Sequence, residues 1–187
     1  MLQTMVLNAQ GAVLMSIRPE WLWKILEGQK TIEVRKTMPK IEPPFKVYLY
    51  CTRGGDELWT REKNGVLPPG SFGTWKMNGT VCAEFVCDKI YEIVVKHGKG
   101  LILLDGGKEI PFTNDNEMCM TKPELHGYLM GKTGYGWHIR EPRIFAERHY
   151  VNELCFRWCI DRVTRPPQSW CYVDDAGIMW MKSAIVG

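Results

Sequence analysis

The order of elements predicts an α+β fold with a mostly β core, which we expect to form a small mixed β-barrel. Three observations support it: short runs of β-branched and aromatic residues, two helical patterns between those runs, and loops rich in glycine and proline. The 187 residues, 45% of them hydrophobic, suffice for one domain with a sizeable core. We expect this domain to span residues 12–175, between a leader of residues 1–11 and a tail of residues 176–187.

A strand, a helix and a second strand form the first predicted unit. The first strand covers residues 12–17 and the second covers residues 31–35. Between them, Pro19 suits the first turn of a helix and Gly28 suits its left-handed end. This helix has one apolar stripe and about nine residues, too few to be stable alone, so we expect it to dock on the sheet.

Loops separate the strands that follow. Residues 45–52 are aromatic and β-branched and predict a strand, whereas the glycines and prolines of residues 53–79 predict a long loop insertion. A strand is expected from residue 79 to 87, continuing through residues 90–95. The second insertion, residues 96–120, contains turns and a hairpin.

The second helix, near residues 121–131, begins with the capping-box pattern of Thr121 and Glu124. Glycines at 131 and 134 end it, and a strand over residues 135–139 follows. Residues 140–162 give no clear pattern. A proline turn then leads into a last strand that ends near residue 173.

Composition narrows the functional classes only slightly. A net charge of +3 permits an anionic partner but does not demand one. Seven cysteines, an odd number, and the lack of any basic residue before Arg18 favour reduced thiols and a cytoplasmic location. No apolar run is long enough to span a membrane. We expect neither a cofactor nor a metal, because the spacing of His149, Cys155, Cys159 and Cys171 matches no zinc motif.

Charged side chains follow the first helix in a row. Because strand residues two apart share a face, Glu33 and Arg35 should point the same way, while Ile32 and Val34 point into a core. Together with Lys30 they place two cations beside one carboxylate, which suits an anion or a polar base. We expect the three charged groups to open into one water-accessible hollow; the alternative is an ion-paired strand on a barrel rim.

Two motifs resemble the ASCH family of the PUA-like superfamily. They are Ser-Ile-Arg-Pro at residues 16–19 and Gly-x-Lys-Thr-x-Glu-x-Arg at residues 28–35. Residues 166–173, Pro-Pro-Gln-Ser-Trp-Cys-Tyr-Val, resemble the ends of uncharacterised ASCH proteins of prophages and low-GC bacteria. The resemblance covers residues 12–173. It implies a partly open barrel that binds RNA or a modified nucleobase in a cleft beside the first helix.

The predicted ligand-binding residues are Arg18, Lys30, Glu33, Arg35, Tyr50, Trp137, Gln168, Ser169 and Trp170. The cations among them suit phosphate or a base carbonyl, and Glu33 with Gln168 offers the donors and acceptors that read a base edge. A tryptophan ring suits stacking on the base. For Trp137 the alternative is core packing, for Tyr50 a plain strand edge, and for Trp170 burial in a closing turn.

An enzymatic alternative rests on one branch of the family, which resembles acetylcytidine amidohydrolases. That branch has a catalytic lysine at the position of Lys30 and a nucleophilic threonine at the position of Glu33. Here Glu33 would instead activate a water while Lys30 steadies negative charge, on an acylated nucleoside or on RNA. Glu84 is either a buried partner of Lys30 or Arg35 or an outward charge, and His138 is expected to be structural. A protein-interaction accessory of a mobile element is the third alternative.

Overall fold

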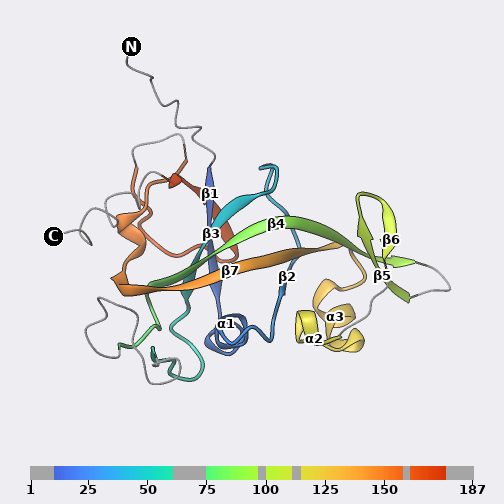
Figure 1. Cartoon of the computed structure of the whole chain (residues 1–187), viewed down its shortest axis with the longest axis horizontal. Helices are drawn as coiled ribbons and strands as arrows, with labels where there is room; N and C mark the ends of the chain where they lie inside the picture. Colours follow the sequence, from blue (N-terminus) through green and yellow to red (C-terminus); the bar gives the residue numbers. More distant parts are fainter. Residues whose placement is uncertain (1–10, 61–74, 97–99, 111–114, 158–160, 176–187) are drawn as a thin grey trace, which may run out of the picture.

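Two long antiparallel strands, β4 (Val81–Lys96) and β7 (Gly134–His149), run through the middle of the molecule (Figure 1). The computed structural model describes residues 11–60, 75–96, 100–110, 115–157 and 161–175. Its sheet of eight strands has the order β2-β7-β4-β3-β1-β8, with β5 and β6 attached beside β4. The remaining strands are β1 (Ala12–Ile17), β2 (Ile32–Arg35), β3 (Phe45–Cys51), β5 (Gly100–Asp105), β6 (Lys108–Ile110) and β8 (Trp170–Val173).

The sheet is barrel-like but not closed. β1 and β3 are parallel, and the other pairs are antiparallel. The end strands of the order are β2 and β8, and no strand pairing joins them in the described part of the chain. We call the line along which β2 faces β1 and β8 the seam. The α+β, barrel-like prediction is therefore confirmed, with an opening at a defined place.

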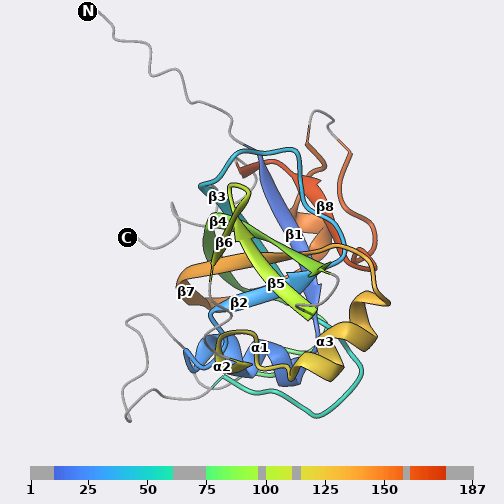
Figure 2. The ribbon, with the colours of Figure 1, turned by 90° about the vertical axis from the view of Figure 1, so that its right-hand side faces the viewer.

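Three helices lie along one side of the sheet, as Figure 2 shows. They are α1 (Pro19–Leu26), α2 (Asp115–Met118) and α3 (Lys122–Leu129). α1 has proline in its first turn, a buried Leu22 and Ile25, and Gly28 at φ 73° after its end, as predicted. The capping box of α3 is also present, because Glu124 accepts from the Thr121 backbone N–H at 2.8 Å.

Strand β7 is much longer than residues 135–139, the length that the sequence predicted. It continues to His149 because β4 pairs with it along its length, from Ile93↔Gly134 to Val81↔His149. Three register shifts interrupt this ladder and break the alternation by which a strand is recognised. A 3-10 turn, η1 (Val151–Glu153), follows. The hairpin expected within residues 96–120 is β5–β6.

Both faces of β2 are buried, so Glu33 and Arg35 on this strand lie inside the molecule. Ile32 and Val34 pack under α2 and α3 in one hydrophobic cluster, so their predicted core position is confirmed. The opposite face of β2 looks into the main cluster, which we call the barrel core and which includes Met15, Leu49 and Trp137.

No helix in the described ranges is long and apolar enough to cross a bilayer. The predicted leader, apart from Gly11, and the predicted tail lie outside the described residues, as do residues 61–74 of the first insertion.

Candidate nucleic-acid interface

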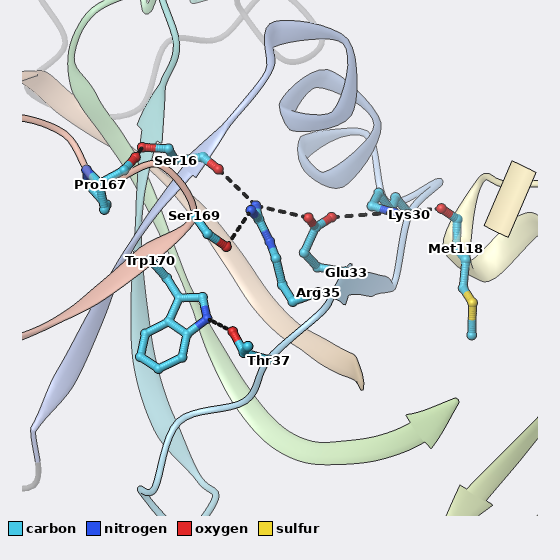
Figure 3. Close-up of polar contacts among 9 residues, drawn as sticks. All are labelled: Ser16, Lys30, Glu33, Arg35, Thr37, Met118, Pro167, Ser169 and Trp170. Atoms are coloured by element: carbon cyan, nitrogen blue, oxygen red, sulfur yellow. Dashed lines mark hydrogen bonds and ion pairs between the residues drawn. The ribbon is translucent and has the colours of Figure 1, made fainter. Parts of the chain in front are cut away.

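Lys30, Glu33 and Arg35 meet in one cluster (Figure 3). The Glu33 carboxylate lies between the two cations, with Oε1 3.0 Å from Arg35 Nη2 and Oε2 3.4 Å from Lys30 Nζ. The three residues are only 2%, 6% and 8% exposed, respectively. Each carboxylate oxygen therefore has its own counter-ion in a poorly solvated site, where such pairing is needed to offset desolvation.

Backbone groups from distant parts of the chain complete this cluster. Lys30 Nζ donates to the Met118 carbonyl at 2.5 Å, and it lies 5.1 Å from the centre of the Trp21 ring. Arg35 Nη2 donates to the Ser16 carbonyl at 2.8 Å and Nη1 to Ser169 Oγ at 3.4 Å. The expectation of a water-accessible hollow is wrong, because the protein's own groups surround the three charges.

Side chains close the seam where strand pairing is missing. Besides Arg35, the Trp170 indole N–H donates to Thr37 Oγ1 at 3.0 Å, and the backbone N–H of Lys40 donates to the Tyr172 hydroxyl at 2.7 Å. These contacts join the segment after β2 to β8. Each of these hydrogen bonds contributes about 0.5–1.5 kcal/mol, so the few that cross the seam hold it with a small free energy.

Two buried donors beside the seam have no acceptor among the described residues. They are Nε of Arg35 and Nε1 of Trp137, and Trp137 is fully buried. β2 and β7 pair Glu33 with Trp137, so both donors belong to the face of the barrel core. Burying an unsatisfied donor costs about 1–3 kcal/mol. An external acceptor, such as a base carbonyl or a water, would remove that cost.

An aromatic row extends from the barrel core to the seam. The ring of Trp137 lies 5.7 Å from Phe45 and 5.8 Å from Trp170, and Trp170 lies 5.3 Å from Tyr172. The full burial of Trp137 favours core packing for it over stacking on a ligand. Trp170 is half-buried and stands at the seam, so of the two tryptophans it is the better placed to contact a base.

A cleft of ≈ 540 Å³ lies next to the seam. It is lined by residues 36–40, Glu42 and Tyr135, and it includes the exposed cations Lys36 and Lys40. Tyr135 pairs with Arg35 across β2 and β7, so the cleft is continuous with the face that holds the buried cluster. Sequence reasoning missed Lys36, Thr37 and Lys40, although Lys36 and Thr37 directly follow the charged row.

The other predicted ligand residues are dispersed. Arg18 is exposed before α1, with its guanidinium 3.8 Å from Glu20, and Gln168 is exposed beside Ser169. Tyr50 is directed away from the cluster, because alternation along β3 places it with Tyr48 in a second hydrophobic cluster. The seam therefore brings together Lys30, Glu33, Arg35, Ser169 and Trp170 but not Tyr50.

Glu84 and His138 have partners of their own. The carboxylate of Glu84 lies 3.9 Å from Lys46 and 3.7 Å from Arg143, so of its two alternatives the pairing with Lys30 or Arg35 is wrong. His138 Nδ1 lies 2.6 Å from Asp88, as expected of a structural histidine.

Cys51, Cys82, Cys87, Cys155 and Cys171 carry free thiols. Burial raises the pKa of Cys51 to about 12 and that of Cys171 to about 11, which keeps both as neutral thiols near pH 7. Within the described ranges, no group of three or more His, Cys, Asp or Glu residues is arranged to hold a metal. Cys159, one of the four residues considered for zinc, lies outside these ranges.

Comparison with known proteins finds a match to a domain family and similar crystal structures. Residues 15–93 match the ASCH domain family. The crystal structure of ASCH from Zymomonas mobilis is similar, with a TM-score of 0.57 and 16% identity over 92% of this chain and 94% of that chain. The structure of its serine-to-alanine variant has a TM-score of 0.57 and 15% identity, over 94% of this chain and 97% of that chain. The structure of its tyrosine-to-phenylalanine variant has a TM-score of 0.55 and 16% identity, over 92% of this chain and 96% of that chain. No curated protein matches the chain. The prophage origin and cytoplasmic location stay predictions.

Proposed function

We propose that this chain, whose residues 15–93 match the ASCH domain family, is a PUA-like protein that binds single-stranded RNA or a modified nucleobase at the seam. The observation that carries the proposal is a pair of buried donors, Arg35 Nε and Trp137 Nε1, that have no acceptor among the described residues. They lie beside a seam where the described strands form no ladder. A base carbonyl is an acceptor of the kind that these donors lack.

Different residues around the seam contact the phosphate, the face of the base and the edge of the base. Lys36 and Lys40 on the neighbouring cleft meet phosphates, which position a strand without reading its sequence. Trp170 supplies the stacking surface, worth about 1–3 kcal/mol per base. Gln168, exposed beside Ser169, offers an amide donor and acceptor to a base edge. Arg18 adds a further exposed cation at the start of α1.

Glu33 and Lys30 lie buried beneath this site and do not contact the ligand. The carboxylate is occupied by two cations, and Lys30 is engaged by Glu33 and Met118. Their role is to hold Arg35 in place while Trp170 releases Thr37 and the base enters. Recognition of a base edge thus falls to Gln168 and to the free Nε–H of Arg35 rather than to Glu33.

Hydrolysis of an acylated nucleoside or of RNA is the second candidate function. It is favoured by the 3.4 Å approach of Lys30 Nζ to the Glu33 carboxylate, which places a general base beside a cation. The low exposure of both groups opposes it, because substrate and water must reach them. Incubation with N4-acetylcytidine and with RNA tests it. Turnover that disappears in Glu33→Gln while the variant keeps the wild-type circular dichroism spectrum supports hydrolysis, and no turnover in the wild type removes it.

Fluorescence anisotropy with a labelled single-stranded RNA tests the binding function. We expect affinity that falls between about 50 and about 200 mM salt, because phosphate contacts release counter-ions. The double variant Lys36→Ala/Lys40→Ala should reduce the salt slope by about 1.4, at about 0.7 for each phosphate that the protein no longer neutralises. Trp170→Ala should lower affinity at both salt concentrations.

A matched control is the double variant Lys96→Ala/Lys108→Ala, which removes the same two charges from β4 and the β5–β6 hairpin. It should bind as the wild type does. Equal losses in the two double variants would show that only net charge matters. No binding of RNA or of modified nucleosides at micromolar protein would overturn the proposal.

A further inference from the structure

A second cleft, of ≈ 450 Å³, opens where β3 ends. Tyr50 lines it, together with Arg53, residues 150–152 around η1 and residues 164–166 before β8. Alternation along β1 and β3 directs Leu14, Ser16 and Tyr50 away from the barrel core. The cleft therefore lies on the opposite face of the β1–β3 pair from the seam.

The charge of this cleft is positive and uncompensated. Arg53 and Arg165 contribute two exposed guanidinium groups, and none of the described residues that line the cleft is an aspartate or a glutamate. Within the described part of the chain, neither guanidinium has an ion pair or a hydrogen bond. Two like charges on one cleft repel each other, and an anion between them relieves that repulsion. Phosphate fits arginine especially well, since the planar fork gives two parallel hydrogen bonds.

Aromatic and amide groups accompany the two arginines. Tyr150 is 52% exposed, a high value for a large ring, and it stands on the wall of the cleft. Tyr50 is 5% exposed and contributes to the buried floor. Asn152, exposed on η1, adds a donor and an acceptor. An exposed ring beside paired cations is the combination that binds a base together with its phosphate.

The cleft is built on fixed turns. Gly79 has φ 82°, and a Cβ on it would lie 3.2 Å from Arg53 Nε, so the arginine lies across the bare glycine backbone. The N–H of Gly79 donates to the Cys51 carbonyl at 2.8 Å, which ties this turn to the end of β3. On the other wall, Arg162 Nη1 donates to the Asn152 carbonyl at 2.9 Å and holds η1 in place.

We propose that this cleft binds a nucleotide, with the phosphate between Arg53 and Arg165 and the base on the ring of Tyr150. The ligand is a nucleoside monophosphate unit, either free or within a single-stranded RNA. The site goes beyond the seam because it uses none of the seam residues. The two are nevertheless neighbours along the chain, since residues 164–166 line this cleft while Ser169 and Trp170 contact β2 and the residues after it.

Calorimetric titration with adenosine monophosphate, adenosine and inorganic phosphate tests the site. The monophosphate should bind at least about tenfold more tightly than adenosine, because the charged contacts require phosphate. Arg53→Ala/Arg165→Ala should lower its affinity by about tenfold or more, whereas Lys96→Ala/Lys108→Ala, with the same change in net charge, should leave it unchanged. Tyr150→Ala should weaken it on the order of tenfold, and Tyr150→Phe should retain it.

Two further titrations show whether the cleft takes free nucleotides or RNA, and whether binding occurs here or at the seam. A single-stranded pentamer that binds much more tightly than the monophosphate, and that loses this advantage in Arg53→Ala/Arg165→Ala, assigns the cleft to RNA. Equal affinities for the pentamer and the monophosphate in Trp170→Ala assign it to free nucleotides. Loss of binding in Trp170→Ala with retention in Arg53→Ala/Arg165→Ala would place the nucleotide at the seam and overturn the second site. Equal, weak affinities for adenosine and its monophosphate would overturn it as well.

Discussion

The buried cluster at the seam and the cleft at the end of β3 each contain two cations, but only the cluster contains a carboxylate. Lys30 and Arg35 are at most 8% exposed and share Glu33, whereas Arg53 and Arg165 are exposed and share no acidic neighbour. The same residue types therefore do different work. A buried carboxylate neutralises two cations, which then stabilise the fold. Two cations without such a carboxylate can bind an anionic ligand.

The largest expected effect comes from removing the shared counter-ion. Glu33→Gln leaves Lys30 and Arg35 buried without their carboxylate, and we expect a loss of about 3–5 kcal/mol in the free energy of unfolding. Urea denaturation followed by circular dichroism measures it. A loss below about 1 kcal/mol would mean that the cluster is solvated and open, as the sequence alone suggested.

A smaller effect is expected from Arg35→Lys. Lysine can still pair with Glu33, but it lacks the fork that reaches the Ser16 carbonyl and Ser169 Oγ together. We expect a loss of about 1–3 kcal/mol in unfolding free energy, measured in the same urea experiment. Wild-type stability would show that the guanidinium does not hold the seam.

Gly79→Ala tests how the open cleft is built. A Cβ at φ 82° is strained and approaches Arg53 Nε at 3.2 Å, so we expect a loss of about 1 kcal/mol in stability together with a displaced Arg53. Thermal unfolding and monophosphate affinity report the two effects separately. Unchanged monophosphate affinity would mean that the position of Arg53 does not matter.

The smallest expected effect concerns the exposed arginines. Arg53→Ala/Arg165→Ala removes no ion pair that the described residues provide, so stability should stay within about 0.5 kcal/mol of the wild type. Urea denaturation of this double variant and of Glu33→Gln compares the loss of unfolding free energy in the two regions directly. A loss comparable to that of Glu33→Gln would show that these arginines are structural and would break the comparison.

The sequence predicted what depends on local spacing. Alternation placed Glu33 and Arg35 on one face of β2 with Ile32 and Val34 on the other, and the helix ends followed from proline and glycine. It could not predict that the charged face is covered, because Met118 and Ser169 reach it from 88 and 134 residues away. Bulges in the β4–β7 ladder concealed the second half of β7.

The cleft at β3 was missed for a similar reason. Arg53, Tyr150 and Arg165 are far apart in the sequence, and no local motif joins them. One signal was available: along β3, Tyr48 and Tyr50 alternate with Val47, Leu49 and Cys51, which places Tyr50 away from the barrel core. That alternation is enough to separate Tyr50 from the seam residues.

A crystal structure of the protein soaked with a mixture of modified nucleosides tests the central claim most directly. We predict a flat base against Trp170 at an opened seam, with an acceptor within hydrogen-bonding distance of Arg35 Nε. A closed seam with only an ordered water on Arg35 Nε, and no base against Trp170, would contradict the account.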